Sequence, residues 1–283
     1  FCNAELPGSF AILINHHMRG KYPLTPFKWI ASSFIQDRRS TILHDTYGVL
    51  LHNPRNWLPC AEMNGDIMRV ANIQHIAASV HARFADTGGA TLYTSDAGVN
   101  IGTDYEHQEE LNADVNFFQI MCGLVTTAVG GTMLFKQYTF FTELSRSFLV
   151  YIYPLFDTID IIKPKTSRPG NSEIYIICKG YHGMPDNIMD VITQYDKTPI
   201  VAIDPMLDAA LFEILTQLVT TQATHLNRVY GSYIDPDTTI RVDRRTAWET
   251  WSQSNPMINA GWSINLATTK SKEINRKGGQ NVR

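Results

Sequence analysis

In some segments apolar residues recur every three to four positions, which predicts helices, and in others they form short runs, which predict strands. The helical spacing predicts helices over 11–18, 67–84, 105–128, 141–155 and 207–229, whereas short apolar runs predict strands over 1–5, 28–33, 90–95, 132–135, 158–162 and 173–178. Residues 47–57 are rich in Pro, Asn and His and are expected to be irregular.

The order of these elements predicts an open α/β sheet. Helices between the early strands imply parallel pairing, and Gly130-Gly131 is expected to end the helix before the strand 132–135. The last two strands are joined by a short loop containing Pro, Gly and Asn rather than by a helix, so we expect them to pair antiparallel. The sequence therefore predicts a mostly parallel sheet with one reversed strand.

Composition and charge narrow the class of protein. A chain of 283 residues with 44% hydrophobic residues can bury a full core. A net charge of −3 excludes a wholly basic nucleic-acid coat but leaves room for a local basic groove. Because no apolar run reaches the ~18 residues of a membrane span and no signal peptide is visible, we expect a soluble, cytoplasmic protein.

The cysteines and histidines do not predict a metal site or a disulfide framework. Cys2, Cys60, Cys122 and Cys178 lie far apart and form no CxxC motif, so we expect reduced cysteines in the core. The neighbouring pair His16-His17 cannot share one helix face, which argues against metal binding there.

Three charged residues stand at predicted strand ends. Asp96 ends the strand 90–95, Lys136 follows the strand 132–135, and Glu173 opens the last strand. In open α/β sheets ligands bind at the edge where such strand ends meet. A lysine between two carboxylates at that edge can accept or donate a proton.

Four sequence motifs occur in the order that one enzyme family shows. They are Ala-Glu-Leu-Pro-Gly-Ser-Phe at 4–10, Asn-Gly-Asp-Ile-Met at 64–68, Thr-Ser-Asp-Ala-Gly at 94–98 and Lys-Pro-Lys-Thr-Ser-Arg-Pro-Gly-Asn-Ser-Glu-Ile-Tyr at 163–175. Over residues 1–181 the chain resembles the FtsJ-like ribose 2′-O-methyltransferases. Within this family it is most similar to the mRNA cap-methylating branch of eukaryotes and large cytoplasmic DNA viruses. The resemblance implies a Rossmann-like sheet that binds S-adenosylmethionine.

The resemblance also implies a catalytic set of Lys, Asp, Lys and Glu. Asp96, Lys136 and Glu173 match its last three members, and the first lysine is expected upstream of Phe1. Lys136 would accept the proton of the ribose 2′-hydroxyl, and the two carboxylates would orient Lys136 and the ribose. The carboxylates raise the pKa of such a lysine, while burial, a sulfonium and a second lysine lower it.

For the cofactor, the resemblance implies a set of contacts near the first turn and at two carboxylates. The predicted S-adenosylmethionine-binding residues are Glu5, Pro7, Gly8, Ser9, Phe10, Asp66 and Asp96. Two features depart from the family: Leu6 stands where a small residue is usual, and 28–33 offers no acid for the cofactor ribose.

RNA is the partner that the resemblance implies. Lys163, Lys165 and Arg168 would lie beside RNA phosphates, or they are solvated loop charges. Trp248, Trp251 and Trp262 could stack on a base, but large tryptophans are more often core residues, which is the reading we favour.

The predicted organisation has three parts. Residues 1–181 form the methyltransferase core, whose first part is expected before residue 1; 182–267 form a mainly helical extension, and 268–283 a flexible basic tail. The predicted function is S-adenosylmethionine-dependent methylation of an RNA ribose 2′-hydroxyl near an mRNA cap. The alternative is a catalytically inactive methyltransferase-like scaffold that binds RNA or a partner. A nucleotide-dependent oxidoreductase is disfavoured because no GxGxxG follows the first strand.

Overall fold

The structure is a computed structural model that describes residues 1–35, 45–58, 64–234, 246, 249–251 and 253. The chain divides into two compact units. The larger unit contains Phe1 and residues 67–254, and the smaller unit contains residues 2–66 together with 255–283, which lie outside the described part.

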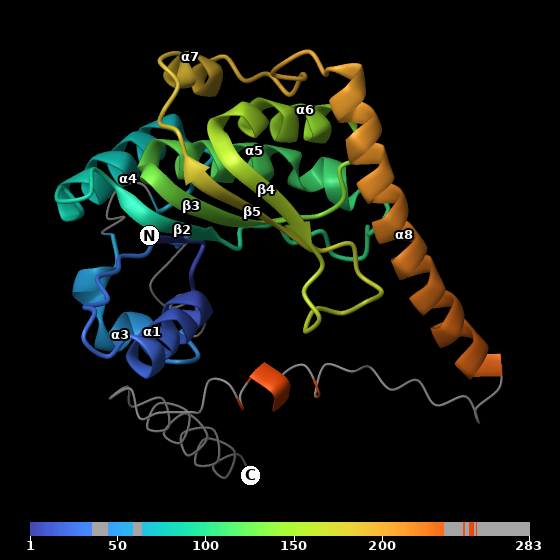
Figure 1. The fold of residues 1–283 in the computed structure, drawn as a ribbon, viewed down its shortest axis with the longest axis horizontal. Helices are drawn as coiled ribbons and strands as arrows, with labels where there is room; N and C mark the ends of the chain where they lie inside the picture. The colour runs from blue at the N-terminus through green and yellow to red at the C-terminus, as the bar shows by residue number, and fades with distance from the viewer. Residues whose placement is uncertain (36–44, 59–63, 235–245, 247–248, 252, 254–283) are drawn as a thin grey trace, which may run out of the picture. The chain divides into compact units, whose positions relative to one another are not determined.

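The larger unit is built on a mixed sheet (Figure 1). Its strands are β2 (Ala90–Ser95), β3 (Thr127–Gln137), β4 (Phe156–Ile162) and β5 (Ile174–Tyr181), in the spatial order β2-β3-β5-β4. β2 and β3 run parallel, and β5 is antiparallel to both β3 and β4. Phe1 extends the pairing, because its carbonyl accepts a hydrogen bond from Thr94 N at 3.0 Å. The predicted Rossmann-like sheet with one reversed strand is confirmed.

Helices cover one face of this sheet and continue beyond it. They are α4 (Val70–Arg83), α5 (Gln108–Thr126), α6 (Glu143–Ile152), the 3-10 turn η2 (Tyr153–Leu155), α7 (Ile188–Thr193) and α8 (Pro205–Ile234). In Figure 1, α4, α5 and α6 lie over the same face, and α8 runs past α6 as one long helix. Tyr93, Phe117, Phe135, Phe140 and Phe148 are fully buried and fill the core between helices and sheet.

The sequence predicted that Gly130 and Gly131 end α5, but they do not. α5 ends at Thr126 and β3 begins at the next residue, so Gly130 and Gly131 lie inside the strand. The register with β2 shifts there, since Ala90 pairs with Thr127 but Leu92 pairs with Thr132. A Cβ on Gly131 would lie 2.7 Å from the Ala128 carbonyl oxygen. Gly131 therefore has no room for a side chain, and Gly130 has a φ of +77° that favours glycine, so both accommodate an irregularity of the strand.

The smaller unit packs a short helix against extended segments. Its elements are β1 (Cys2–Asn3), α1 (Ser9–Lys21), α3 (Val49–His52) and the 3-10 turn η1 (Pro54–Asn56). The predicted strand over 28–33 is wrong: the segment makes only isolated bridges, from Ala31 to Cys2 and to Trp57. The predicted irregular stretch 47–57 contains α3 and η1 instead. Trp29, Ala31, Val49 and Trp57 belong to the core of this unit.

The structure describes three of the four cysteines and one of the three tryptophans near the C-terminus. Cys2, Cys122 and Cys178 are buried and free, as predicted, while Cys60 lies outside the described residues. Trp251 is half-buried rather than a core residue, and Trp248, Trp262 and the tail 268–283 lie outside the described part. Within that part, no helix combines the length and the apolar character needed to cross a bilayer.

Candidate functional site

Lys136 and Asp96 form an ion pair at the edge of the sheet. Ser95 of β2 pairs with Phe135 of β3, so the residues that follow them, Asp96 and Lys136, lie side by side. Lys136 Nζ lies 2.9 Å from Asp96 Oδ1 and donates to the Asp96 backbone carbonyl at 3.1 Å. The Lys136 side chain is only 12% exposed, whereas that of Asp96 is 43% exposed. The ammonium of Lys136 is therefore largely buried and paired with a carboxylate that solvent and ligands can reach.

The reversed strand β5 adds two further groups to this pair. Lys136 pairs with Tyr175 across β3 and β5, and Glu173 immediately precedes the strand. The Tyr175 hydroxyl donates to Asp96 Oδ1 at 3.2 Å, and Lys136 Nζ lies 5.8 Å from the centre of the Tyr138 ring. The structure thus brings the three predicted residues Asp96, Lys136 and Glu173 to one place, with two tyrosines that sequence reasoning missed.

The charges around Lys136 and its burial have opposite effects on its pKa. Burial is the largest single influence and lowers the pKa of Lys136, but Asp96, Tyr138 and Glu173 together outweigh it and raise that pKa above the ordinary value. Burial and the same two carboxylates raise the pKa of Tyr175. Tyr175 therefore keeps its proton and donates, and in this arrangement Lys136 is a cation at neutral pH.

A stripe of buried amides on α5 positions the backbone of the site. Asn112, Asn116 and Gln119 are each fully buried on a helix that is otherwise largely apolar. Gln119 Nε2 donates to the Lys136 carbonyl at 2.7 Å, and Asn112 Oδ1 accepts from Val99 N at 3.0 Å. The sequence signal was available, since amides at i, i+4 and i+7 share one helix face.

Gly98, two residues after Asp96, leaves space for the lysine. A Cβ at this position would lie 3.3 Å from Lys136 Nζ and 3.3 Å from the Tyr138 hydroxyl. Either group would have to shift by a few tenths of an ångström to admit it. The glycine in Thr-Ser-Asp-Ala-Gly is therefore explained by the close approach of the ammonium.

The loop between β4 and β5 is organised around Lys163. Its Nζ donates to the Glu173 carbonyl at 2.7 Å, to the Asn171 carbonyl at 2.8 Å and to Asn171 Oδ1. Burial lowers the pKa of Lys163, and Glu173 opposes this effect. Ser167 Oγ donates to Glu173 Oε1 at 2.8 Å. The loop thus holds both the backbone and the carboxylate of Glu173.

The other two predicted RNA contacts have a different environment. Lys165 and Arg168 are exposed on the same loop, where their charges face solvent. Lys163 is half-buried and commits its ammonium to Asn171 and Glu173. RNA contact by Lys163, Lys165 and Arg168 stays a prediction, and the geometry favours Lys165 and Arg168 for it.

In the smaller unit, two of the predicted cofactor residues support the first helix. The buried Glu5 carboxylate accepts a hydrogen bond from Ala11 N at 2.9 Å and so satisfies a free amide at the start of α1. Gly8 has a φ of +108°, and a Cβ there would lie 2.6 Å from Val49 Cγ2. Packing against Val49 is therefore sufficient reason for the glycine, and its contact with a cofactor stays a prediction.

The remaining predicted cofactor residues of the smaller unit lie around the turn before α1 and in the turn before α4. Pro7 is half-buried, Ser9 is exposed, and Phe10 and Leu6 pack against the core cluster of the smaller unit. Asp66 N donates to Asn64 Oδ1 at 3.4 Å in the turn that precedes α4. Their roles toward a cofactor stay predictions as well. Within the described residues, no group of three His, Cys, Asp or Glu side chains could hold a metal ion.

Comparison with known proteins identifies related sequences. A sequence model of the FtsJ-like methyltransferase family matches residues 5–181. A probable methyltransferase of African swine fever virus is 38% identical over 189 residues, covering 63% of this chain and 43% of that protein. A cap-specific mRNA (nucleoside-2′-O-)-methyltransferase 2 of Drosophila melanogaster is 30% identical over 190 residues, covering 63% of this chain and 26% of that protein.

A solved structure described as a ribosomal RNA methyltransferase of Plasmodium falciparum matches with a TM-score of 0.44 and 17% identity, covering 64% of this chain and 85% of that chain. The chain spans less than half the length of the two curated relatives named above.

Proposed function

Because the chain belongs to the FtsJ-like methyltransferase family, we propose that it transfers a methyl group from S-adenosylmethionine to a ribose 2′-hydroxyl of RNA, near an mRNA cap. The observation that carries this proposal is the ion pair of Lys136 and Asp96 at 2.9 Å, with Glu173 and Tyr175 beside it. A buried lysine held by carboxylates suits a step whose only proton comes from a hydroxyl. The similarity to the cap-specific mRNA (nucleoside-2′-O-)-methyltransferase 2 of Drosophila melanogaster supports a ribose 2′-oxygen near the cap as the methylated position.

The residues present fit the proposed cofactor in chemical type. When bound, S-adenosylmethionine supplies an electrophilic methyl group on a sulfonium. In the smaller unit, the turn at Pro7 and Gly8 leads into the start of α1, where backbone N–H groups attract a carboxylate. Asp66 offers a carboxylate for hydroxyl or amino groups. In the larger unit Asp96 would face the positive charge.

The chain's own residues would handle the proton. Lys136 Nζ, once neutral, takes the proton of the 2′-hydroxyl as the oxygen–methyl bond forms and the sulfur–methyl bond breaks. Asp96 and Glu173 stabilise the ammonium that results, and Tyr175 fixes Asp96 by donating to it. Much of the rate would come from holding the ribose oxygen in line with the methyl group.

RNA is the proposed partner, bound through its phosphates. Exposed Lys165 and Arg168 on the loop before Glu173 give salt-dependent contacts that do not depend on sequence. If the chain acts like its viral relative, it would work in the host cytoplasm.

One observation favours a second reading, a catalytically inactive scaffold. The raised pKa of Lys136 keeps the lysine protonated near neutral pH, and a protonated lysine cannot accept a proton. The two readings differ in whether a sulfonium and a further lysine lower that pKa enough for transfer.

The deciding experiment measures transfer of a labelled methyl group from S-adenosylmethionine to capped and uncapped RNA, followed by nuclease digestion to locate the methyl. Label on a ribose 2′-oxygen supports the proposal. A folded protein that binds S-adenosylmethionine and transfers nothing to either RNA supports the scaffold, and label on a base contradicts the ribose assignment.

The pH dependence of transfer should follow Lys136. Since only the neutral lysine is a base and its pKa is raised, the rate should increase about tenfold per pH unit from about pH 7 until the lysine is neutral. Asp96→Asn removes a charge that raises this pKa, so its profile should move to lower pH even though its maximal rate falls. Initial rates of both proteins against pH test this, and a flat wild-type profile would argue against a lysine base.

Lys163 should act on the rate rather than on RNA affinity. Lys163→Met removes the donors that hold Asn171 and Glu173, so we expect the rate at saturating RNA to fall roughly ten- to a hundredfold through misplacement of Glu173. Lys165→Met, on the exposed part of the loop, is the matched control and should mainly weaken RNA binding and reduce its salt dependence. An unchanged rate with weaker RNA binding for Lys163→Met would instead make Lys163 an RNA contact.

A further inference from the structure

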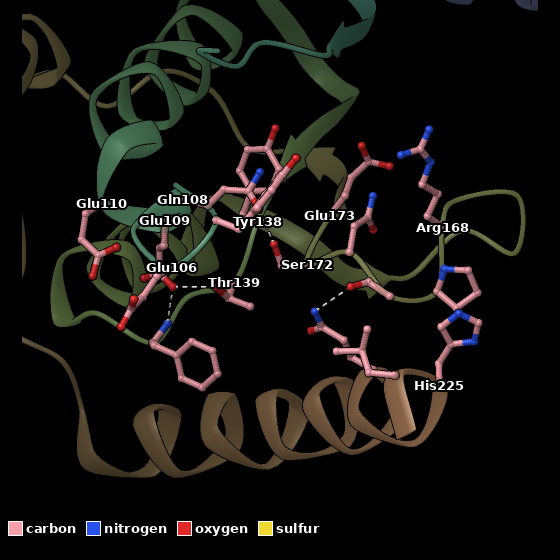
Figure 2. Close-up of a pocket in the computed structure, with 17 residues that line it drawn as sticks. Glu106, Gln108, Glu109, Glu110, Tyr138, Thr139, Arg168, Ser172, Glu173 and His225 are labelled. Carbon is pink, nitrogen blue, oxygen red and sulfur yellow. Dashed lines mark hydrogen bonds between the residues drawn. The ribbon is translucent and has the colours of Figure 1, made fainter. Parts of the chain in front are cut away.

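A cavity of about 810 Å³ lies in the larger unit beside Glu173 and Tyr138. Its walls are the start of α5, the segment that follows β3, the loop before β5 and one side of α8 (Figure 2). This volume is within the range typical of small-molecule sites and is ample for one nucleotide.

Helix α8 forms one wall of the cavity and is held by polar contacts. Gln222 Nε2 donates to the Gly170 carbonyl at 3.0 Å, and a Cβ on Gly170 would lie 3.2 Å from Leu226. At the other end of the helix, Arg146 Nε donates to Asp208 Oδ1 at 2.6 Å. The residues of α8 lie outside 5–181, the part matched by the family model. This wall is therefore a feature of the present chain beyond the matched core.

Charge is unevenly distributed around the cavity. Glu106 and Glu110 lie at one end, and Arg168 and His225 lie at the other (Figure 2). Glu109 lies with the other two glutamates, and its carboxylate already accepts hydrogen bonds from Thr139, Phe141 and Thr142. The cavity thus offers acceptors at one end and cationic or neutral donors at the other.

The middle of the cavity is polar and aromatic. Ser172 Oγ donates to Gln108 Oε1 at 2.7 Å, which leaves the Gln108 amide nitrogen as a donor. Tyr138 lines the same region and also borders Lys136. A ligand here would lie next to the proposed catalytic groups with a ring available for stacking.

We propose that this cavity binds a guanine nucleotide of the RNA strand, adjacent to the ribose that is methylated. The phosphate lies at Arg168 and His225, and the base reaches Glu106 and Glu110. Guanine is the base whose pairing edge presents an imino and an amino donor side by side, which matches a carboxylate acceptor. The adjacency to the target ribose rests on the proposed function; the binding of the nucleotide does not.

The test is calorimetric titration of the full chain with GMP, AMP, CMP and UMP. GMP should bind with a dissociation constant on the order of 0.1–1 mM, and the other three at least about tenfold more weakly. The double change Glu106→Gln and Glu110→Gln should remove the preference for GMP, because an amide cannot accept both donors. The single change Glu213→Gln, which removes one exposed carboxylate of α8 outside the cavity, should leave the preference for GMP intact. Arg168→Ala should weaken any binding of all four nucleotides alike.

Equal binding of the four nucleotides, no binding of GMP, or a preference that survives the double change would overturn the proposal. Failure here is distinct from failure of the proposed function. GMP-selective binding without methyl transfer would support the nucleotide site and contradict the proposed enzymatic activity. Methyl transfer without nucleotide selectivity would support the activity and contradict the nucleotide site.

Discussion

Replacing Lys136 by alanine should lower methyl transfer to RNA by about 100- to 10,000-fold, the usual contribution of a positioned general base. The binding of S-adenosylmethionine should stay nearly unchanged, because the lost interaction is made mainly in the transition state. The reason lies in the geometry: the Lys136 side chain is only 12% exposed, and its Nζ lies 2.9 Å from Asp96 Oδ1.

The variant Lys136→Arg distinguishes two roles of Lys136, its positive charge and its ability to accept a proton. Arginine can keep the ion pair with Asp96 but does not lose its proton in the accessible pH range, so this variant should be as inactive as the alanine variant. Asp96→Ala and Glu173→Ala should also be impaired, by amounts that do not add, since groups that act as a unit are not additive. The measurement is labelled methyl transfer alongside calorimetry with the demethylated cofactor. An active Lys136→Arg enzyme would show that Lys136 stabilises charge and is not the base.

The candidate site was predictable where it depends on strand ends. Asp96 and Lys136 follow neighbouring parallel strands, and such ends meet at one sheet edge whatever the details of packing. Glu173 joins them because the short loop makes β5 antiparallel to β4, and β5 also pairs with β3. The order of elements therefore explains the meeting of Asp96 and Lys136, whereas the position of β5 between β3 and β4 does not follow from the loop alone.

Other features depend on packing that the sequence pattern does not show. The glycines at 130–131 signalled a helix end, but they accommodate an irregular register between β2 and β3. Lys163 resembled a solvated loop charge, yet its hydrogen bonds organise the loop around Glu173. Each case depends on contacts that the apolar pattern of the segment does not show, with β2 for the glycines and with Asn171 and Glu173 for Lys163.

Glu109 is a further residue that the sequence did not single out, although it holds the segment after Lys136. It lies in the first turn of α5 and is 5% exposed. Its Oε2 accepts from Thr139 Oγ1 and from Phe141 N, both at 2.8 Å. Its Oε1 accepts from Thr142 N at 2.8 Å and from Thr142 Oγ1 at 2.7 Å. One carboxylate thus joins α5 to Thr142, the N-cap residue of α6.

We expect Glu109→Ala to lower the free energy of unfolding of the larger unit by about 3 kcal/mol or more, since hydrogen bonds to a charged acceptor are worth roughly 1.5–3 kcal/mol each and are not additive. For a unit of this size the melting temperature should fall by roughly 6–12 °C. Glu109→Gln should lie between wild type and the alanine variant, because its amide keeps one oxygen acceptor but places a donor against donors. Glu110→Ala, the exposed neighbour in the same helical turn, is the matched control and should change the free energy by less than about 0.5 kcal/mol. Thermal unfolding followed by circular dichroism compares the four proteins, and a Glu109→Ala variant as stable as Glu110→Ala would mean that the segment after β3 is held by its apolar contacts and not by this carboxylate.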